Sequence, residues 1–145
     1  MRQSGRGNWI VISLVVVAAV IFSVFLFSGE SPSVASERFM EALAKGDAEA
    51  LTDMSYFSPE RPRDKVLSDW KKTLEISKYY RFAWITKSSS SPAPGRASVK
   101  MEFTRDADKG SAYSEGFSLD LVQKNGKWLV DVKSLSRELY PALPR

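Results

Sequence analysis

The sequence predicts an α+β fold, with helices in the first half of the globular part and antiparallel strands in the second half. Apolar residues recur at helical spacing between residues 31 and 76. From residue 79 onward, apolar and polar residues alternate, as in strands with one buried face. An Asn-Gly pair at 125–126 separates the last two apolar runs, and this pair is typical of a tight β-hairpin turn.

The first element is an uncharged segment over residues 9–27, which reads WIVISLVVVAAVIFSVFLF. As a helix it would be roughly 28 Å long, close to the thickness of the hydrocarbon core of a bilayer. A lone segment in lipid satisfies its backbone hydrogen bonds only as a helix. We therefore expect a single transmembrane helix over residues 9–27, preceded by a cytoplasmic tail over residues 1–8.

A cleaved signal peptide is the alternative for this segment. The apolar region of a signal peptide usually has about 7–15 residues, which is shorter than the region here. Small residues suited to cleavage stand at Ser33 and Ala35, where a cut would remove the start of the next helix. Arg2 and Arg6 precede the segment and Glu30 follows it. The positive-inside rule therefore puts the N-terminus in the cytoplasm and the C-terminal domain outside it, in the periplasm if the cell is Gram-negative.

Three helices are expected after a short linker over residues 28–30. The first begins with Ser-Pro at 31–32, an N-cap residue followed by a proline in the first turn, and ends at Gly46. Asp47 caps a second, short helix. The third covers residues 63–76, and its apolar stripe consists of Val66, Trp70 and Leu74.

The second half predicts a curved antiparallel sheet of about four strands, over residues 79–87, 96–106, 113–121 and 128–132. The run SSSSPAPG, residues 88–95, has the composition of a flexible loop. Residues 135–140 are expected to form a short terminal helix before a proline-rich tail over residues 141–145. The α+β domain is thus expected to span residues 31–140.

Composition excludes several kinds of chemistry, because the chain has no Cys and no His. Disulfides, thiolate nucleophiles, the commonest zinc sites and acid–base catalysis by histidine are all ruled out. Arg2 and Arg6 account for two of the 21 basic residues, and the remaining 19 nearly balance 17 acidic residues. Nucleic-acid binding usually needs a dense basic patch, so no nucleic-acid partner is expected.

Two small clusters are weak candidates for chemistry. Asp53 and Tyr56 pair a carboxylate with a phenol, as an isomerase site does, but such residues more often end a helix and fill a loop. Asp106 and Asp108 could offer oxygen ligands to a cation, but basic residues flank them and a solvated turn explains them better. We therefore assign no catalytic residue, no metal ligand and no cofactor.

Two stretches carry a family resemblance. Residues 31–51, SPSVASERFMEALAKGDAEAL, resemble the opening of cystatin-like and NTF2-like domains, and residues 125–132, NGKWLVDV, resemble their last hairpin. The resemblance covers residues 31–134 in element order and implies helices packed on one face of a curved sheet. This superfamily includes isomerases, dehydratases, binding modules and subunits of larger complexes. The resemblance therefore implies a fold and leaves the function open.

Large aromatic residues are concentrated in the predicted strands. In a regular strand over residues 79–87, Tyr80, Phe82 and Trp84 share one face. Such rings either fill the core beneath the helices, line an apolar pocket, or form a docking surface. The candidates for contact with a partner or ligand are Tyr80, Trp84 and Trp128.

These observations favour a non-catalytic accessory or scaffold subunit of a membrane protein complex. Its transmembrane helix and its extracytoplasmic domain would contact other subunits of that complex. A membrane-tethered module that binds a small apolar ligand or a peptide is the alternative. An NTF2-like enzyme is the third interpretation.

Overall fold

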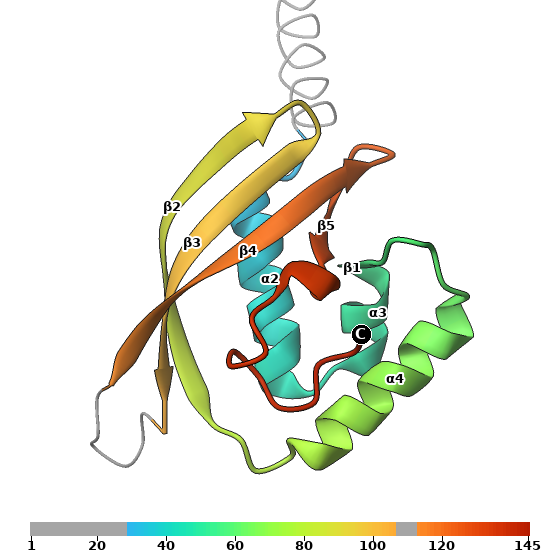
Figure 1. Ribbon diagram of the computed structural model, residues 1–145, viewed down its shortest axis with the longest axis vertical. Coiled ribbons are helices and arrows are strands. Elements are labelled where there is room, and N and C mark those ends of the chain that lie inside the picture. Colours follow the sequence, from blue (N-terminus) through green and yellow to red (C-terminus); the bar gives the residue numbers. More distant parts are fainter. Residues whose placement is uncertain (1–28, 107–112) are drawn as a thin grey trace, which may run out of the picture.

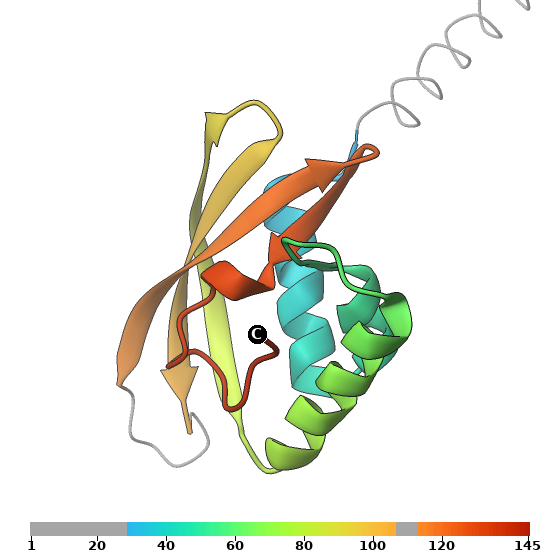
Figure 2. The same ribbon diagram turned by 45° about the vertical axis from the view of Figure 1, so that its right-hand side comes forward.

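Helices and a curved sheet form two layers in the computed structural model, which describes residues 29–106 and 113–145. Figures 1 and 2 show the helices on the concave side of the sheet. The expected α+β class is confirmed. The predicted cytoplasmic tail and transmembrane helix, residues 1–8 and 9–27, lie outside the described residues. Within the described ranges, no helix is long and apolar enough to cross a membrane.

The first helix begins and ends where the sequence predicts, and the second begins at the predicted cap. Helix α2 covers Pro32–Lys45, and the side chain of Ser31 caps its N-terminus. Gly46 ends α2 in a left-handed conformation with a φ of 70°, which glycine adopts without steric cost. The side chain of Asp47 then caps helix α3, Ala48–Asp53.

The third helix, α4, has the predicted bounds, Arg63–Ile76. Val66 and Trp70 from its predicted stripe are buried, and Leu74 is half-buried against the core. The indole N–H of Trp70 donates to the hydroxyl of Ser55 at 2.9 Å, so α4 is tied to the segment that follows α3.

The sheet has five strands in the order β1-β5-β4-β3-β2. Their bounds are Ser55–Tyr56 for β1, Phe82–Ala93 for β2, Arg96–Arg105 for β3, Ser114–Lys124 for β4 and Lys127–Asp131 for β5. The last four form the expected antiparallel meander. Strand β1 pairs with β5 in parallel and was not expected. Two residues are too few to show an alternating pattern, so the count of about four strands was one too low.

Strand β2 is longer than the sequence predicts. It continues through the serine run to Ala93, so the interpretation of residues 88–95 as a flexible loop was wrong. Pairing of Ser89 with Val99 and of Ser90 with Ser98 provides backbone partners for the serine run. The turn is confined to Pro94 and Gly95, and Gly95 has a φ of 70°.

The core lies between the concave face of the sheet and α2, α3 and α4. Strand β3 contributes the four residues that the alternation predicted to face inward, Ala97, Val99, Met101 and Phe103, all of them buried. On the helical side, Phe39 and Trp70 meet edge to face with ring centroids 5.9 Å apart. Asn125 and Gly126 both have positive φ, as the predicted type I′ hairpin requires.

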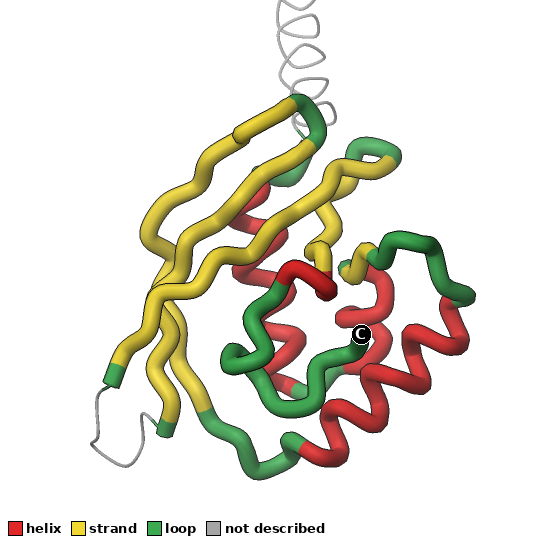
Figure 3. The backbone as a smooth tube through the Cα atoms, in the orientation of Figure 1, coloured by secondary structure: helices red, strands yellow, loops and turns green. Residues whose placement is uncertain are grey.

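The end of the chain differs most from its prediction. A short 3₁₀ turn, Val132–Ser134, follows β5, and no helix forms over residues 135–140. Residues 135–145, here called the C-terminal segment, fold back between the sheet and the helices as a loop (Figure 3). Leu139, Tyr140 and Leu143 are buried in the core. Because Leu143 is buried, the tail expected over residues 141–145 is part of the folded body.

Candidate functional site

The concave face of the sheet carries a row of aromatic rings, which makes it the first candidate site. Exposure alternates along β2, so Phe82 and Trp84 face the helices while Ala83 and Ile85 face outward, as the sequence predicts. The ring of Phe82 stacks on Phe103 at 4.9 Å and lies 5.7 Å from Trp84. The rings contact one another across neighbouring strands and form a continuous aromatic layer.

The C-terminal segment covers one end of this aromatic layer. Tyr140 meets the rings of Tyr80 and Phe82 edge to face, at 5.3 Å and 5.9 Å between centroids. Tyr140 is 4% exposed and Leu139 is 1% exposed. Residues of the C-terminal segment therefore occupy space on the concave face of the sheet.

Side-chain donors hold the main chain of the C-terminal segment in place. From α4, the Thr73 hydroxyl donates to the carbonyl of Ala142 at 2.6 Å. Just after α4, the Ser77 hydroxyl donates to Pro141 at 3.2 Å. From the sheet side, the Tyr80 hydroxyl donates to the carbonyl of Leu139 at 3.4 Å and the guanidinium of Arg105 donates to that of Glu138. These bonds come from both layers and fix the segment between them.

Hydrogen bonds from Arg145 also hold the C-terminal segment in its conformation. The guanidinium of Arg145 donates to the carbonyl of Lys133 at 2.7 Å and to that of Leu135 at 2.8 Å. A charged donor makes stronger hydrogen bonds than a neutral one. Arg145 thereby closes the segment into a loop against the turn after β5.

Glu37 is a site residue that the sequence analysis missed. Its carboxylate accepts a hydrogen bond from the indole N–H of Trp84 at 2.7 Å and another from the hydroxyl of Thr86. It thus links α2 to the sheet. A glutamate between a serine and an arginine on an amphipathic helix is expected to be exposed to solvent. Only the position of β2 in the fold reveals that Glu37 contacts Trp84 and Thr86.

The three aromatic candidates lie in two places. Tyr80 and Trp84 flank Phe82 on the concave face, whereas Trp128 lies on β5, with β4 and β3 between it and β2. All three are half-buried against the core. The polar atoms of Tyr80 and Trp84 are already bonded within the chain. Among the described residues, the indole N–H of Trp128 has no hydrogen-bond partner, so it alone keeps a free donor.

Burial raises the pKa of two tyrosines at this site. For Tyr80 the loss of solvent raises the pKa, and the nearby positive charge of Arg105 opposes that shift. For Tyr140 burial again raises the pKa, and a hydrogen bond with Ser77 opposes it. Both phenols are therefore held in the neutral form, which suits packing and hydrogen-bond donation.

The residues considered as weak candidates for catalysis or cation binding do not form such a site in the described structure. Asp53 is exposed and accepts two hydrogen bonds from Arg63, at 3.0 and 3.1 Å. Tyr56 lies on the short strand β1. Asp106 follows β3, and Asp108 lies outside the described residues. Within the described ranges, no group of three or more acidic residues could hold a metal ion.

Two open grooves border the C-terminal segment. The first, here called the base groove, has a volume of about 670 Å³ and is lined by Leu43, Lys71, Tyr80, Arg81 and Tyr140 among others. The second, here called the α4 groove, runs between α4 and the C-terminal segment and has a volume of about 690 Å³. Its polar lining consists of Arg61, Lys65, Asp69, Lys72, Thr73 and Arg145.

Solved structures with a similar fold differ strongly from this chain in sequence. One from Thiobacillus denitrificans, named as a candidate calcium/calmodulin-dependent protein kinase type II association domain, has a TM-score of 0.53 and 10% identity, over 70% of this chain and 90% of that chain. A SEC-C motif containing protein from Rhodopseudomonas palustris has a TM-score of 0.50 and 18% identity, over 70% and 75%. An NTF-2 like protein from Shewanella oneidensis has a TM-score of 0.48 and 15% identity, over 66% and 88%.

No family model and no curated protein matches the chain. At these identities the likeness shows the fold alone, which is an α+β fold with helices packed on a sheet. Helices packed on a curved sheet, as the resemblance of residues 31–51 and 125–132 implies, agree with that fold.

Proposed function

We propose that this chain is a non-catalytic accessory domain that acts by contact with other proteins and is held at a membrane by residues 9–27. One observation carries the proposal: the C-terminal segment fills the end of the concave face. Tyr140 is packed against Tyr80 and Phe82. A ligand in that place would have to displace buried side chains and the hydrogen bonds that hold their main chain.

The types of side chain present favour a function through contact with other proteins over catalysis. The chain has no His and no Cys. Glu37, a half-buried carboxylate on the concave side, is bonded to two neutral donors that belong to the fold. An acid–base catalyst needs a group whose proton can reach a substrate. The acid and the phenols of the concave face serve instead to join helix, sheet and C-terminal segment.

Membrane attachment rests on the uncharged run over residues 9–27. A Cβ atom on Gly29 would lie 3.6 Å from the carbonyl oxygen of Gly126, so Gly29 lies against the β4–β5 turn. With only residues 28–30 between a membrane helix and the domain, that turn would be near the bilayer surface. Trp128, with its free donor, follows the turn and would be available to a neighbouring subunit.

The test is purification of the full-length protein from membranes in mild detergent, with identification of the proteins that remain bound. Tyr80, Trp84 and Trp128 are each changed to Ala, and folding and co-purification are both measured. We expect Trp128→Ala to lose partners while the domain stays folded, although it loses some stability because the ring packs against the core. If the wild-type protein is monomeric and partner-free, the proposal is wrong.

A small-ligand module is the second candidate, because the base groove has Tyr80 and Tyr140 in its lining. Grooves of this size suit small molecules, which bury apolar surface and meet a few polar groups. Mass spectrometry of the purified full chain under native conditions tests this alternative. A small molecule that remains bound to wild type and is lost in Tyr80→Ala would favour it over the first proposal.

A further inference from the structure

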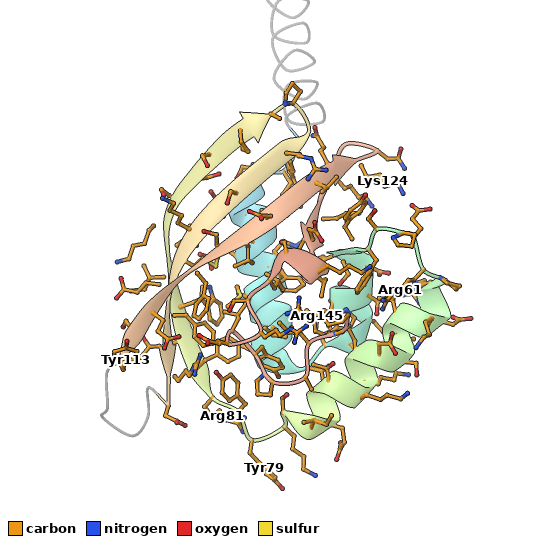
Figure 4. The ribbon with its side chains drawn as sticks, in the orientation of Figure 1. Arg61, Tyr79, Arg81, Tyr113, Lys124 and Arg145 are labelled. Atoms are coloured by element: carbon orange, nitrogen blue, oxygen red, sulfur yellow. The ribbon has the colours of Figure 1, made fainter. Side chains whose placement is uncertain are left out.

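The α4 groove combines an excess of positive charge with an apolar floor. Its two walls are α4 and the C-terminal segment, which are far apart in the sequence. Arg61 stands before the N-terminus of α4, and Arg145 lies at the end of the chain (Figure 4). The C-terminal segment that fills the concave face therefore also builds one side of this second site.

Positive charge in the groove is only partly neutralised. Arg61 and Lys65 share a single carboxylate, that of Asp69, with N–O distances of 3.6 Å and 2.9 Å. Within the described residues, Lys72 forms no ion pair. Arg145 donates only to neutral carbonyls. Four cations thus face one carboxylate, and the excess persists even if residue 145 carries a free α-carboxylate.

Apolar surface lies between these cations. Ile76 is 68% exposed, more than the other large aliphatic residues that are exposed in the described chain, and it borders the groove together with Pro62, Ala142 and Pro144. A second open groove on the neighbouring face of α4 shares Ile76 and Lys72 with the first, but Asp64 and Glu75 also line it. The α4 groove, with an exposed isoleucine beside a lysine that forms no ion pair among the described residues, is thus better suited to a ligand that is both apolar and acidic.

The groove is remote from the proposed membrane attachment. Figures 1 and 2 show α4 on the side of the molecule away from the point where the described chain begins. A site in that position is accessible to a protein while the β4–β5 turn faces the bilayer. This placement favours a protein ligand over a lipid surface.

We propose that the α4 groove binds an acidic segment of a partner protein that carries at least one large aliphatic side chain. Carboxylates of that segment pair with Lys72 and Arg61, and the aliphatic side chain packs on Ile76. Apolar contact gives the complex its stability and the charges give it selectivity. The inference rests on the proposed function, since it names the surface and the kind of partner through which the domain acts.

The test uses the full chain in nanodiscs of phosphatidylcholine and a fluorescein-labelled peptide of about ten residues composed of Glu, Asp and Leu. We expect binding that weakens as salt rises. Lys72→Glu and Ile76→Ser should each weaken it about tenfold or more, because each removes one of the two kinds of contact. Lys100→Glu and Ile85→Ser are the matched controls, since both residues are exposed on the outer face of the sheet, and they should bind as wild type does.

Three outcomes of the binding assay would overturn the inference. The first is equal binding of a peptide in which Ser replaces Leu, because the site would then respond to charge alone. The second is tighter binding of a single-stranded oligonucleotide, or of vesicles of phosphatidylglycerol and phosphatidylcholine, than of the peptide. The third is equal loss of binding in the control variants. If Lys72→Glu retains every protein that co-purifies with wild type, docking occurs elsewhere and only the groove inference fails.

Discussion

Asn125 and Gly126 have φ values of 51° and 77°, and the residues on either side of them, Lys124 and Lys127, pair across the turn. Only glycine adopts such values at no steric cost, and asparagine tolerates them better than most residues. A Cβ at Gly126 would meet nothing within 4 Å, so the restriction comes from the backbone and not from crowding. This single pair sets the register of β4 and β5.

Gly126→Val should therefore destabilise the protein by roughly 1–3 kcal/mol, the cost of forcing a β-branched residue into a strained conformation. Thermal unfolding of the purified protein measures the effect. Asn125→Gly is the control, and it should leave the melting temperature nearly unchanged. A Val variant with the stability of wild type would show that the turn relaxes into another type at no cost.

Tyr80 and Tyr140 give the protein a predicted sensitivity to alkaline pH. Burial raises the pKa of both phenols above the ordinary value of 10.0. A group with a raised pKa in the folded state contributes stability below its unfolded pKa and loses that contribution as pH rises through the folded pKa. Above about pH 10, stability should fall because unfolding allows both phenols to ionise.

The melting temperature measured between about pH 8 and pH 11 checks this expectation. The double variant Tyr80→Phe and Tyr140→Phe should show a shallower decline than wild type, even if it starts from lower stability. Tyr79→Phe is the control, because its ring is 82% exposed, and it should follow the slope of wild type. Equal slopes in all three proteins would contradict the assignment.

The sequence predicts the roles of single residues correctly where they interact only with nearby backbone. Ser31, Gly46 and Asp47 each end or begin a helix through contacts with nearby backbone, so their roles follow from their types. Glu37 was missed because its partners, Trp84 and Thr86, are about 50 positions away along the chain. A contact of that kind depends on the tertiary fold and leaves no local pattern.

Among the elements, the C-terminal segment differs most from what the sequence predicts. Its first residues, 135–140, were expected to form a helix, and residues 141–145 were expected to be a tail because prolines at 141 and 144 interrupt any helix. In the fold, those prolines belong to an irregular segment whose carbonyls accept hydrogen bonds from Thr73 and Ser77. Every residue has a main-chain carbonyl that can accept such a hydrogen bond. The composition of the segment therefore could not have predicted that it packs between the sheet and the helices.

Leu143→Ala tests whether the C-terminal segment belongs to the core. Leu143 is 8% exposed, and its truncation should cost about 2–5 kcal/mol, the usual range for a buried leucine. Chemical denaturation of the full chain measures the loss. Arg137→Ala, at an exposed position of the same segment, should cost far less. A Leu143 variant as stable as wild type would mean that the segment detaches readily and leaves the concave face open.

The helices were easier to predict than the sheet. Helix α4 has the expected bounds because its apolar period and its ends both follow from local sequence. Strand β2 extends through four consecutive serines because β3 supplies its backbone partners. The two residues of β1 join the sheet through a hydrogen bond from the N–H of Val130 to the carbonyl of Met54 at 2.8 Å. The extent of β2 and the presence of β1 both depend on partner strands that are distant in the sequence.

At the scale of the whole molecule, the ends of the chain divide the surface into two regions. Gly29 lies against the β4–β5 turn, and the C-terminal segment ends beside α4. If residues 9–27 span a membrane, the first region faces the bilayer and the α4 groove faces away from it (Figures 1 and 2). Trp128 and the α4 groove would then contact different partner molecules.

The orientation of the whole chain in a membrane can be tested directly. Arg2 and Arg6 precede the uncharged run, so the positive-inside rule places the folded domain outside the cytoplasm with its N-terminus retained. Protease added to sealed, right-side-out spheroplasts should digest the domain, while a cytoplasmic marker protein stays intact. Replacing Arg2 and Arg6 by Glu should reduce the digested fraction, because the charges that orient the helix are reversed. Full protection of the wild-type domain, or a mature N-terminus near Ser36, would show that residues 9–27 are not an anchor of this orientation.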